Sequence, residues 1–579
     1  MSSFYALFGR SIALLVLVLQ GACAQLPEHV DRPVSTALSS PNGTALDALV
    51  QQRRKADGAR FESGFLLLAG PPAAYGSRLA LIEGAQKSLD LQYYAIHADA
   101  STGRLVRGLR AAAERGVRVR ILLDDLHSTG RDALVLGLAF VPNIEMRLFN
   151  PLAGARGSSF ARALNSIGDA SRIQQRMHNK LFLADNVLGV TGGRNLGDAY
   201  FGNALKGNYI DVDILAAGPI VRDLSRSFDS YWNNERAYPV QSLVKRSELE
   251  AIRERAQQAD RELADESARA QNSPPPPTPE AEPKPGAAPT PAQLARAWDE
   301  KPMDLQTARF VWAPAVMLAD QPGKIPADKG AGTTRAPGLV VSQPGDAASS
   351  SRRAAALEAS SDLAAGSDTV VEGLLQLIGQ ARTDLLIISP YFVPGPDMKQ
   401  AFAAARSRGV RIRVLTNSLS SNDAPVAHVG YSRHREDLLR MGVELYELRS
   451  EQTSVGNAFG SSGSGGSLGE SRSMLHSKVL VMDGRLLVVG SMNLDLRSQL
   501  QNTEIALLVR SAELSRVASA QIERGMREGS WRVELNDGSL VWRAPEGSGL
   551  KDTSTEPDAS LTLRLLLRLF GPLAPDQLL

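Results

Sequence analysis

Residues 177–195 read MHNKLFLADNVLGVTGGRN, and residues 475–493 read LHSKVLVMDGRLLVVGSMN. The two stretches share every spacing: His-x-Lys, four residues, Asp, six residues, Gly-Gly or Gly-Ser, one residue and Asn. A single histidine on an apolar strand is more often a core residue than a catalyst. Two matched copies at equivalent points of an internal repeat instead indicate a duplicated functional unit.

The surroundings of the two stretches repeat as well. LDLQYY at residues 89–94 and RGVRVRILLDD at 115–125 correspond to LLIISPYF at 385–392 and RGVRIRVLTNS at 408–418. A helical pattern separates the members of each pair, and the apolar runs are typical of buried strands. The alternation predicts an α/β fold with two repeats, each a mixed β-sheet flanked by helices.

The composition of the chain predicts its divisions. SPPPPTPEAEPKPGAAPTP lacks the backbone donors to fold and is expected to form an extended linker, and the run at 308–319 is expected to be a strand. The C-terminal LTLRLLLRLF is amphipathic and is expected to dock on its own domain, with a membrane surface as the alternative. The expected divisions are an export signal at 1–23, repeat 1 at 60–245, a charged helix and Pro-rich linker at 246–305, repeat 2 at 306–545 with flexible inserts at 320–367 and 456–469, and a tail at 546–579 containing the amphipathic helix.

The N-terminus has the layout of a secretory signal. Its apolar run at residues 11–19 is too short to span a bilayer, so it predicts export. Gly21 and Ala22 precede Cys23 and resemble a lipobox, in which Cys23 becomes lipidated; ordinary cleavage nearby is the alternative. We therefore expect a bacterial envelope protein that is exported, anchored to the membrane and facing the periplasm.

Net charge and cysteine content limit the kinds of binding partner and metal site that the chain can have. With 64 Lys and Arg against 62 Asp and Glu, the net charge is only +2, whereas duplex-binding proteins usually carry a large basic excess. Nucleic acid is therefore not expected as a partner. The single cysteine excludes an intramolecular disulfide and a cysteine-rich zinc site.

The duplicated motif suits phosphodiester chemistry. His178 and Lys180 are two residues apart and project from one face of a strand, as do His476 and Lys478. Brought together about a pseudo-twofold axis, they would supply two imidazoles and two ammonium groups to one shared active site. One imidazole would attack phosphorus and the other would protonate the leaving alcohol, while the lysines bind non-bridging oxygens. We expect no metal and no cofactor, because the lysines already neutralise the developing charge.

Carboxylates near the motifs are candidates for orienting the histidines. An attacking imidazole needs an acceptor on its second nitrogen, and Asp211 or Asp213, together with Glu504, lie downstream of the motifs. Asp185 and Asp483 open tight turns, so we interpret them mainly as turn supports and regard direct catalysis as the lesser alternative.

At these residues the sequence resembles the phospholipase D superfamily, whose signature is two His-Lys-Asp motifs in one chain, and within it the bacterial cardiolipin synthases. The similarity includes SFDSYWNNERAYPV at residues 227–240 and GSMNLDLRS at 490–498, and it covers most of residues 63–509. The resemblance implies two phospholipase D-like repeats packed about a pseudo-twofold axis. It also implies a cardiolipin synthase-type phosphatidyltransferase that moves a phosphatidyl group from a donor phospholipid to phosphatidylglycerol through a phosphohistidine.

The resemblance also implies residue roles. His178 would be the nucleophile and His476 the general acid, although the near-equivalent repeats leave open which histidine attacks. The implied partners are the membrane surface and its phospholipids, phosphatidylglycerol with phosphatidylethanolamine as a second candidate donor; no protein partner is defined. The implied site comprises catalytic His178, Lys180, Asp185, His476, Lys478 and Asp483, phosphate-binding Asn195, Asn493 and Ser491, and histidine-orienting Asp211, Asp213 and Glu504.

Three other functions remain open from the sequence. A hydrolytic phospholipase D would use the same phosphohistidine and release phosphatidic acid to water. A nuclease is opposed by the near-neutral charge and the export signal. A non-catalytic lipid-binding envelope protein is opposed by the two intact His-Lys pairs.

Overall fold

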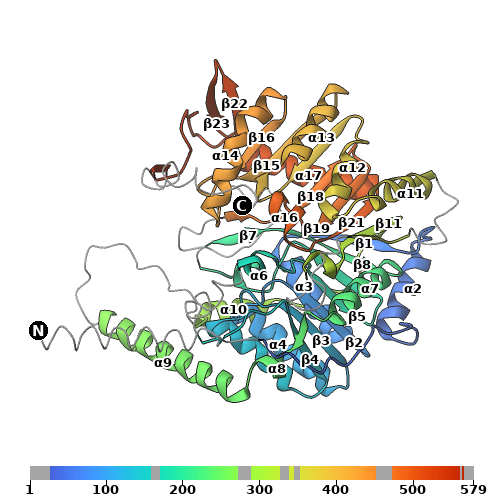
Figure 1. The fold of residues 1–579 in the computed structure, drawn as a ribbon, viewed down its shortest axis with the longest axis vertical. Helices are drawn as coiled ribbons and strands as arrows, with labels where there is room; N and C mark the ends of the chain where they lie inside the picture. The colour runs from blue at the N-terminus through green and yellow to red at the C-terminus, as the bar shows by residue number, and fades with distance from the viewer. Residues whose placement is uncertain are drawn as a thin grey trace, which may run out of the picture.

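The computed structural model of this protein describes residues 26–154, 156–157, 170–205, 207–271, 288–326, 338–343, 352–450, 473–560 and 564–565. Figure 1 shows two lobes, the N-terminal half in blue and green and the C-terminal half in yellow to red. The expected export signal with Cys23 and the insert at 456–469 lie outside the described residues. So do most of the Pro-rich linker and most of the C-terminal amphipathic segment.

The first lobe is built on a mixed sheet of nine strands. Its parallel strands are β2 (Ser88–Tyr93), β3 (Arg118–Asp124) and β4 (Ile144–Phe149). Its antiparallel strands are β1 (Gly64–Ala69), β5 (Leu181–Ala184), β6 (Leu188–Gly192), β8 (Val212–Ala217), β9 (Ala237–Pro239) and β10 (Val311–Trp312). The strand order is β10-β1-β8-β6-β5-β2-β3-β4-β9.

The second lobe repeats this arrangement in a sheet of ten strands, ordered β12-β11-β21-β19-β18-β13-β15-β16-β22-β23. Without the edge strands β10, β12 and β23, the two orders correspond strand for strand, which confirms the predicted duplication. The strands are β11 (Ala315–Asp320), β12 (Leu339–Val341), β13 (Asp384–Ile388), β15 (Arg411–Asn417), β16 (Glu444–Leu448), β18 (Val479–Met482), β19 (Leu486–Gly490), β21 (Ile505–Arg510), β22 (Ser530–Asn536) and β23 (Ser539–Arg543). Two short pairs complete the strands: β14 (Phe392–Val393) with β20 (Leu494–Asp495), and β7 (Asn208–Ile210) with β17 (Ser473–Leu475).

Helices flank both sheets, as predicted, and three occupy equivalent places in the two repeats. These are α3 (Pro71–Gly84), α4 (Ala100–Glu114) and α7 (Ile220–Trp232), matched by α12 (Val370–Ile378), α13 (Pro396–Ser407) and α17 (Ala512–Gly529). The others are α2 (Ala45–Ala56), α6 (Ala170–Gln174), α8 (Val240–Leu243), α9 (Arg246–Gln271), α10 (Pro291–Asp299), α11 (Arg352–Ala365), α14 (Pro425–Arg440) and α16 (Leu496–Leu500), with 3-10 turns η2 (Gly130–Phe140), η4 (Asp198–Tyr200) and η5 (Pro322–Lys324).

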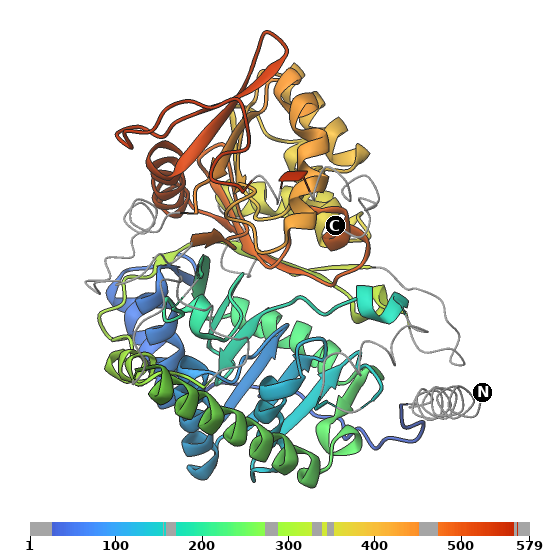
Figure 2. The same cartoon turned by 90° about the vertical axis from the view of Figure 1, so that its left-hand side faces the viewer.

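The expected charged helix is present as α9, which lies along the base of the first lobe in Figure 2. Within the described ranges, no helix has both the length and the apolar composition to cross a membrane.

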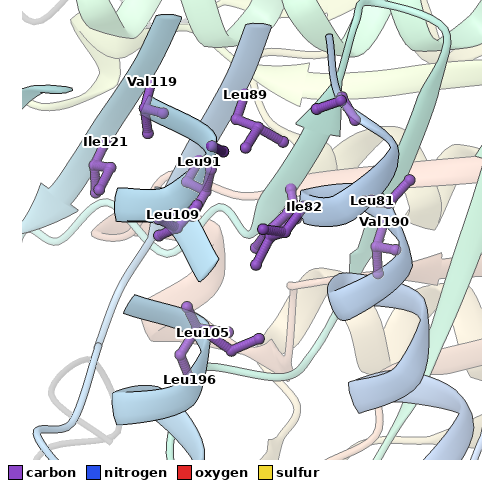
Figure 3. Close-up of a cluster of buried hydrophobic side chains, with 14 of the residues drawn as sticks. Leu81, Ile82, Leu89, Leu91, Leu105, Leu109, Val119, Ile121, Val190 and Leu196 are labelled. Atoms are coloured by element: carbon purple, nitrogen blue, oxygen red, sulfur yellow. The ribbon is translucent and has the colours of Figure 1, made fainter. Parts of the chain in front are cut away.

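Each sheet buries both of its faces, which explains the near-continuous apolar runs of its strands. In the first lobe, α4 packs on β3 and α3 packs on β5 and β6; Figure 3 shows Leu109 beside Leu91 and Leu81 beside Val190. An equivalent cluster lies between α12, α13 and the second sheet. Successive side chains of β5 lie on opposite faces of the sheet. Phe182 packs in the cluster under α3 and α4, and Leu183 packs on the other face.

A third apolar cluster joins the two lobes. It combines Leu183 and Ile214 of the first sheet with Val481, Leu487 and Leu507 of the second, all at most 1% exposed. The two sheets therefore share one core, and the ends of their motif strands are held at a common interface.

The strand expected at residues 308–319 is divided between the sheets. β10 pairs with β1 in the first sheet, Gly64 opposite Trp312, whereas β11 pairs with β21 in the second. Pro314 lies between them, and a proline cannot donate to a ladder. The chain therefore passes from one repeat to the other at this proline, later than the boundary expected at residue 306.

The flexible insert expected at residues 320–367 is also partly wrong. Within it, β12 pairs with β11, and the Ala-rich α11 buries Leu357 and Ala364 in the outer cluster of the second lobe. Alanine and leucine favour helix, and low sequence complexity concealed this apolar face.

Candidate active site

Backbone hydrogen bonds bring the two His-x-Lys segments to one place, where they lie just before β5 and β18; neither lies within a strand, contrary to the prediction from the sequence. The N–H of His178 donates to the carbonyl of Thr503 at 2.9 Å, and that of His476 to the carbonyl of Ile210 at 2.8 Å. Each acceptor belongs to the other repeat. β17 runs parallel to β7, and Met177 bridges Thr503 in the same sense. The two motifs therefore dock on each other in a pseudo-symmetric way.

The histidines are held by carboxylates in a crossed arrangement. Nδ1 of His178 lies 3.0 Å from Oε2 of Glu504, and Nδ1 of His476 lies 2.7 Å from Oδ2 of Asp211. Each carboxylate comes from the repeat that does not carry its histidine, and both are buried. An ionised carboxylate only accepts, so Nδ1–H donates to it and Nε2 keeps its lone pair for chemistry.

Each lysine binds the backbone of the histidine in its own motif, and the charges of both lysines affect the pKa of both imidazoles. Lys180 Nζ donates to the carbonyl of His178 at 2.5 Å, and Lys478 Nζ to that of His476 at 2.6 Å. Burial, followed by the charges of the two lysines, holds the pKa of each histidine well below its usual value. Burial also lowers the lysine pKa values, to about 7 for Lys180 and about 8 for Lys478. The four groups form one electrostatic unit with neutral imidazoles.

The orienting carboxylates are tuned by the same surroundings. Burial raises the pKa of Glu504 and of Asp211 to about 6, and the lysine charges oppose that increase. Both are therefore mostly ionised at neutral pH. Within the described part of the chain, no group of three or more His, Cys, Asp or Glu is placed to hold a metal ion.

Of the two aspartates considered beside the first motif, only Asp211 reaches a histidine. Asp213 instead accepts from Arg78 Nη2 at 2.8 Å and lies 3.4 Å from Arg194 Nε. Asp211 lies in the break between β7 and β8, so strand alternation does not relate its direction to that of Asp213 within β8. The expectation that Asp213 orients a histidine is corrected accordingly.

Ser491 supports a carboxylate, contrary to the phosphate-binding role expected for it. Its hydroxyl donates to Glu504 Oε2 at 2.5 Å and accepts the N–H of Ile505 at 3.0 Å. A Cβ on its counterpart Gly193 would lie 2.5 Å from an oxygen of Asp211. The motifs differ here because the first half-site needs space for a carboxylate, and the second uses a hydroxyl to hold one.

The two motif asparagines differ in availability. Asn195 donates to the hydroxyl of Tyr200 at 3.0 Å and accepts the N–H of Ala95 at 3.2 Å, so its amide is engaged within the first lobe. For Asn493, the backbone N–H donates to Ser498 Oγ, and the buried Oδ1 has no hydrogen-bond partner among the described residues. Phosphate oxygens need an N–H donor, whereas the Oδ1 of Asn493 is an acceptor, so the phosphate-binding role expected for both asparagines stays a prediction.

The motif aspartates lie at the far ends of their strands. Asp185 accepts backbone N–H groups from residues 86–88, and Asp483 accepts those of residues 382–384. Both adopt a left-handed conformation, with φ of 50° and 52°. Their contacts are those of turn supports that fix the loop before β2 or β13, and neither accepts from a histidine.

The surroundings of His178 include residues that the motif did not reveal. The ring of Tyr94 lies 5.0 Å from that of His178, and His127 lies 4.9 Å from Tyr94. Arg497, on α16, adds to the effects that lower the pKa of His178. Its buried Nε has no hydrogen-bond partner among the described residues.

The surroundings of His476 are acidic and aromatic instead. The rings of Tyr200 and Tyr209 lie 5.4 and 5.1 Å from that of His476. Tyr209 donates its hydroxyl to Asp423 at 2.9 Å, and Tyr391 donates to the same carboxylate at 2.7 Å. Of these residues, only Asp423 could have been noticed in the sequence. When the two repeats are aligned, it stands opposite Gly130, so the acidic side chain is present in the second repeat alone.

A pair of carboxylate-oriented imidazoles flanked by two lysines, formed between duplicated α/β repeats, defines a phospholipase D-type enzyme. The chain belongs to the cardiolipin synthases of that superfamily: the family model described as cardiolipin synthase, PLD-like domain, matches residues 79–232 and 374–526, one segment in each lobe. The members of this family are phospholipid-modifying enzymes.

Individual relatives cover most of the chain. Cardiolipin synthase C of Escherichia coli strain K12 is 32% identical over 526 residues, which cover 87% of this chain and 94% of that protein. An uncharacterized protein of Helicobacter pylori strain 26695 is 31% identical over 551 residues, which cover 92% of this chain and 93% of that protein. The crystal structure of phosphatidylserine synthase from Haemophilus influenzae Rd KW20 has the same fold, with a TM-score of 0.50 at 12% identity, covering 91% of this chain and 99% of that one.

Replacing Glu504 by Gln tests the crossed arrangement. The substitution keeps the size of the side chain but removes the charge that holds Nδ1–H of His178, so we expect turnover of phosphatidylglycerol vesicles to fall by roughly 10³-fold or more. Glu556→Gln is the matched control, because Glu556 is bound to Arg435 at 2.8 Å and to His428 at 3.4 Å. Near-normal turnover by folded Glu504→Gln protein, checked by circular dichroism, would contradict the assignment.

Proposed function

We propose that the protein is a cardiolipin synthase-type phosphatidyltransferase, which moves a phosphatidyl group from a donor phospholipid to phosphatidylglycerol through a phosphohistidine. The donor is phosphatidylglycerol or phosphatidylethanolamine. The observation that carries the proposal is the single site of two histidines, each oriented by a carboxylate of the other repeat. The 32% identity to a protein named cardiolipin synthase C, over most of both chains, supports the substrate class.

In the first step, Nε2 of one histidine attacks phosphorus while the bond to the headgroup oxygen breaks. The other histidine, in its protonated form, gives its proton to that oxygen, so a neutral alcohol leaves. Lys180 and Lys478 neutralise the charge on the non-bridging oxygens. A bound phosphodiester anion also offsets the lysine charges and raises the imidazole pKa values, which favours the protonated partner.

Electrostatic differences between the half-sites support His178 as the nucleophile. Beyond the effects of burial and the lysines, Arg497 lowers the pKa of His178, whereas Asp423 raises that of His476. A nucleophile must be neutral and a general acid must carry a proton. The surroundings therefore favour attack by His178 and proton donation by His476.

In the second step, the terminal hydroxyl of phosphatidylglycerol replaces the departed alcohol. Its oxygen attacks phosphorus, the bond between phosphorus and the nucleophilic histidine breaks, and the hydroxyl proton returns to the other histidine. The product is cardiolipin, and both histidines regain their starting forms. With water in place of the hydroxyl, the same step yields phosphatidic acid, so the acceptor decides between transfer and hydrolysis.

We further propose that the protein acts at the bacterial envelope, exported, anchored through Cys23 and facing the periplasm. The support is the signal-like sequence at residues 1–23 and a substrate that resides in membranes. The intact mass of the mature protein tests this: diacylglyceryl and acyl groups on an N-terminal Cys23 are expected, and an unmodified mature N-terminus would contradict it.

Product analysis tests the reaction. Purified mature protein is incubated with acyl-labelled phosphatidylglycerol vesicles, with and without phosphatidylethanolamine, and the lipids are analysed by mass spectrometry. We expect cardiolipin from the wild type, and a loss of at least roughly 10³-fold for His178→Ala and for His476→Ala, because each step needs both imidazoles. His434→Ala, on helix α14, is the histidine control.

Three outcomes would count against the proposal. Phosphatidic acid alone would indicate a hydrolase. Unchanged lipid with well-folded protein would indicate lipid binding without turnover. Cardiolipin formation by either histidine variant at a near-normal rate would contradict the two-histidine mechanism.

A further inference from the structure

The loop between β15 and α14 is one of the places where the two repeats diverge beside the active site. When the repeats are aligned on RGVRVRILLDD and RGVRIRVLTNS, Asp423 falls opposite Gly130. The strands before this loop are nearly identical in pattern. The carboxylate is therefore a feature of the second repeat, and the pseudo-symmetry does not account for it.

Asp423 is held in place by both lobes. Tyr209, from β7 of the first lobe, donates its hydroxyl to one carboxylate oxygen at 2.9 Å. Tyr391, beside β14 in the second lobe, donates to the other oxygen at 2.7 Å. Asp423 is an exposed residue, and a carboxylate oxygen that accepts one hydrogen bond can accept another. Two phenols thus fix an anionic acceptor without satisfying it completely.

This carboxylate lies beside the histidine that handles the alcohol. The ring of Tyr209 is 5.1 Å from that of His476 and stacks on Tyr200 at 4.6 Å. The other titratable groups facing His476 are Asp211, which holds its Nδ1 at 2.7 Å, and Lys478, Lys180 and His178, which lower its pKa. Asp211 is committed to Nδ1 of His476, so Asp423 is a second carboxylate on this side of the site and is not used to orient a histidine.

The geometry of the proposed reaction places the leaving and entering alcohols near Asp423. Nucleophilic attack by His178 expels the headgroup on the opposite side of phosphorus, next to His476. The acceptor alcohol enters from that same side, because its proton goes to the same imidazole. The space around His476 is consequently where the headgroup alcohol leaves and where the new alcohol arrives.

We propose that Asp423, held by Tyr209 and Tyr391, is the subsite that recognises the headgroup alcohol. A carboxylate only accepts hydrogen bonds, so the subsite takes small headgroups that donate them: the hydroxyls of glycerol or the ammonium of ethanolamine. It disfavours choline, whose quaternary nitrogen has no N–H, and serine, whose carboxylate is repelled. This assignment depends on the proposed function, and specifically on His476 serving the alcohol.

Competition between soluble acceptors tests the subsite. Full-length protein is incubated with vesicles of acyl-labelled phosphatidylglycerol and equal concentrations of isotope-labelled glycerol, ethanolamine, choline and serine, and the phosphatidyl products are quantified by mass spectrometry. We expect wild-type protein to favour the glycerol and ethanolamine products. Asp423→Asn should reduce that preference over choline and serine by about tenfold, as loss of a charged hydrogen-bond partner does. Tyr391→Phe, which removes one of the two phenols, should shift the preference in the same direction by a smaller factor.

The two donor chemistries separate in this experiment. A loss confined to ethanolamine in Asp423→Asn would assign the subsite to ammonium headgroups, and a loss for both acceptors would assign it to hydrogen-bond donors in general. Asp437→Asn is the control, since that exposed carboxylate on α14 accepts from Lys399 at 3.0 Å.

The inference and the proposed function fail in different ways. Unchanged acceptor preference in Asp423→Asn, with normal transfer, would overturn the subsite alone. Absence of any phosphatidyl transfer by the wild type, to a soluble alcohol or to phosphatidylglycerol, would overturn the proposed function and the subsite with it.

Discussion

Each motif histidine is oriented by a carboxylate from the opposite repeat, and the rest of the structure maintains that crossed contact. Glu504 holds His178, and Asp211 holds His476, so neither repeat contains a complete half-site. The apolar cluster between the two sheets and the paired strands β7 and β17 set the relative position of the lobes. Folding of both repeats and their docking are therefore required before either imidazole has a fixed tautomer.

The two halves of the site have the same His-Lys arrangement but differ in a few neighbouring residues. Gly193 gives Asp211 room to approach, whereas Ser491 at the equivalent position donates to the longer Glu504. Near the histidines the charges also differ, with Arg497 beside His178 and Asp423 beside His476. A double displacement needs such differences, because one imidazole must attack phosphorus and the other must exchange protons with alcohols.

The repeated sequence pattern was sufficient to predict the two-sheet fold and the convergence of both His-x-Lys pairs, because the apolar runs indicate strands and the matched spacing puts the two motifs at equivalent points of the repeats. Contacts that cross between repeats were not predictable in this way. Periodicity could not separate Asp211 from Asp213, since the chain breaks its strand at Asp211, and it could not show that Asn195 is occupied by Tyr200. Likewise, a proline at position 314 is a general indication that a strand is interrupted. The pairing of β10 with β1 of the first sheet depends on contacts between residues far apart in the sequence, which no local pattern predicts.

The proposed mechanism carries the phosphatidyl group on one particular nitrogen, Nε2 of His178. Full-length protein incubated with labelled phosphatidylglycerol, then denatured rapidly at alkaline pH and digested, would be examined by peptide mass spectrometry for a lipid-phosphate adduct. We expect an adduct on His178, and its loss in His178→Ala. An adduct on His476 would reverse the roles of the two histidines, and turnover with no adduct on either histidine would contradict the phosphohistidine mechanism itself.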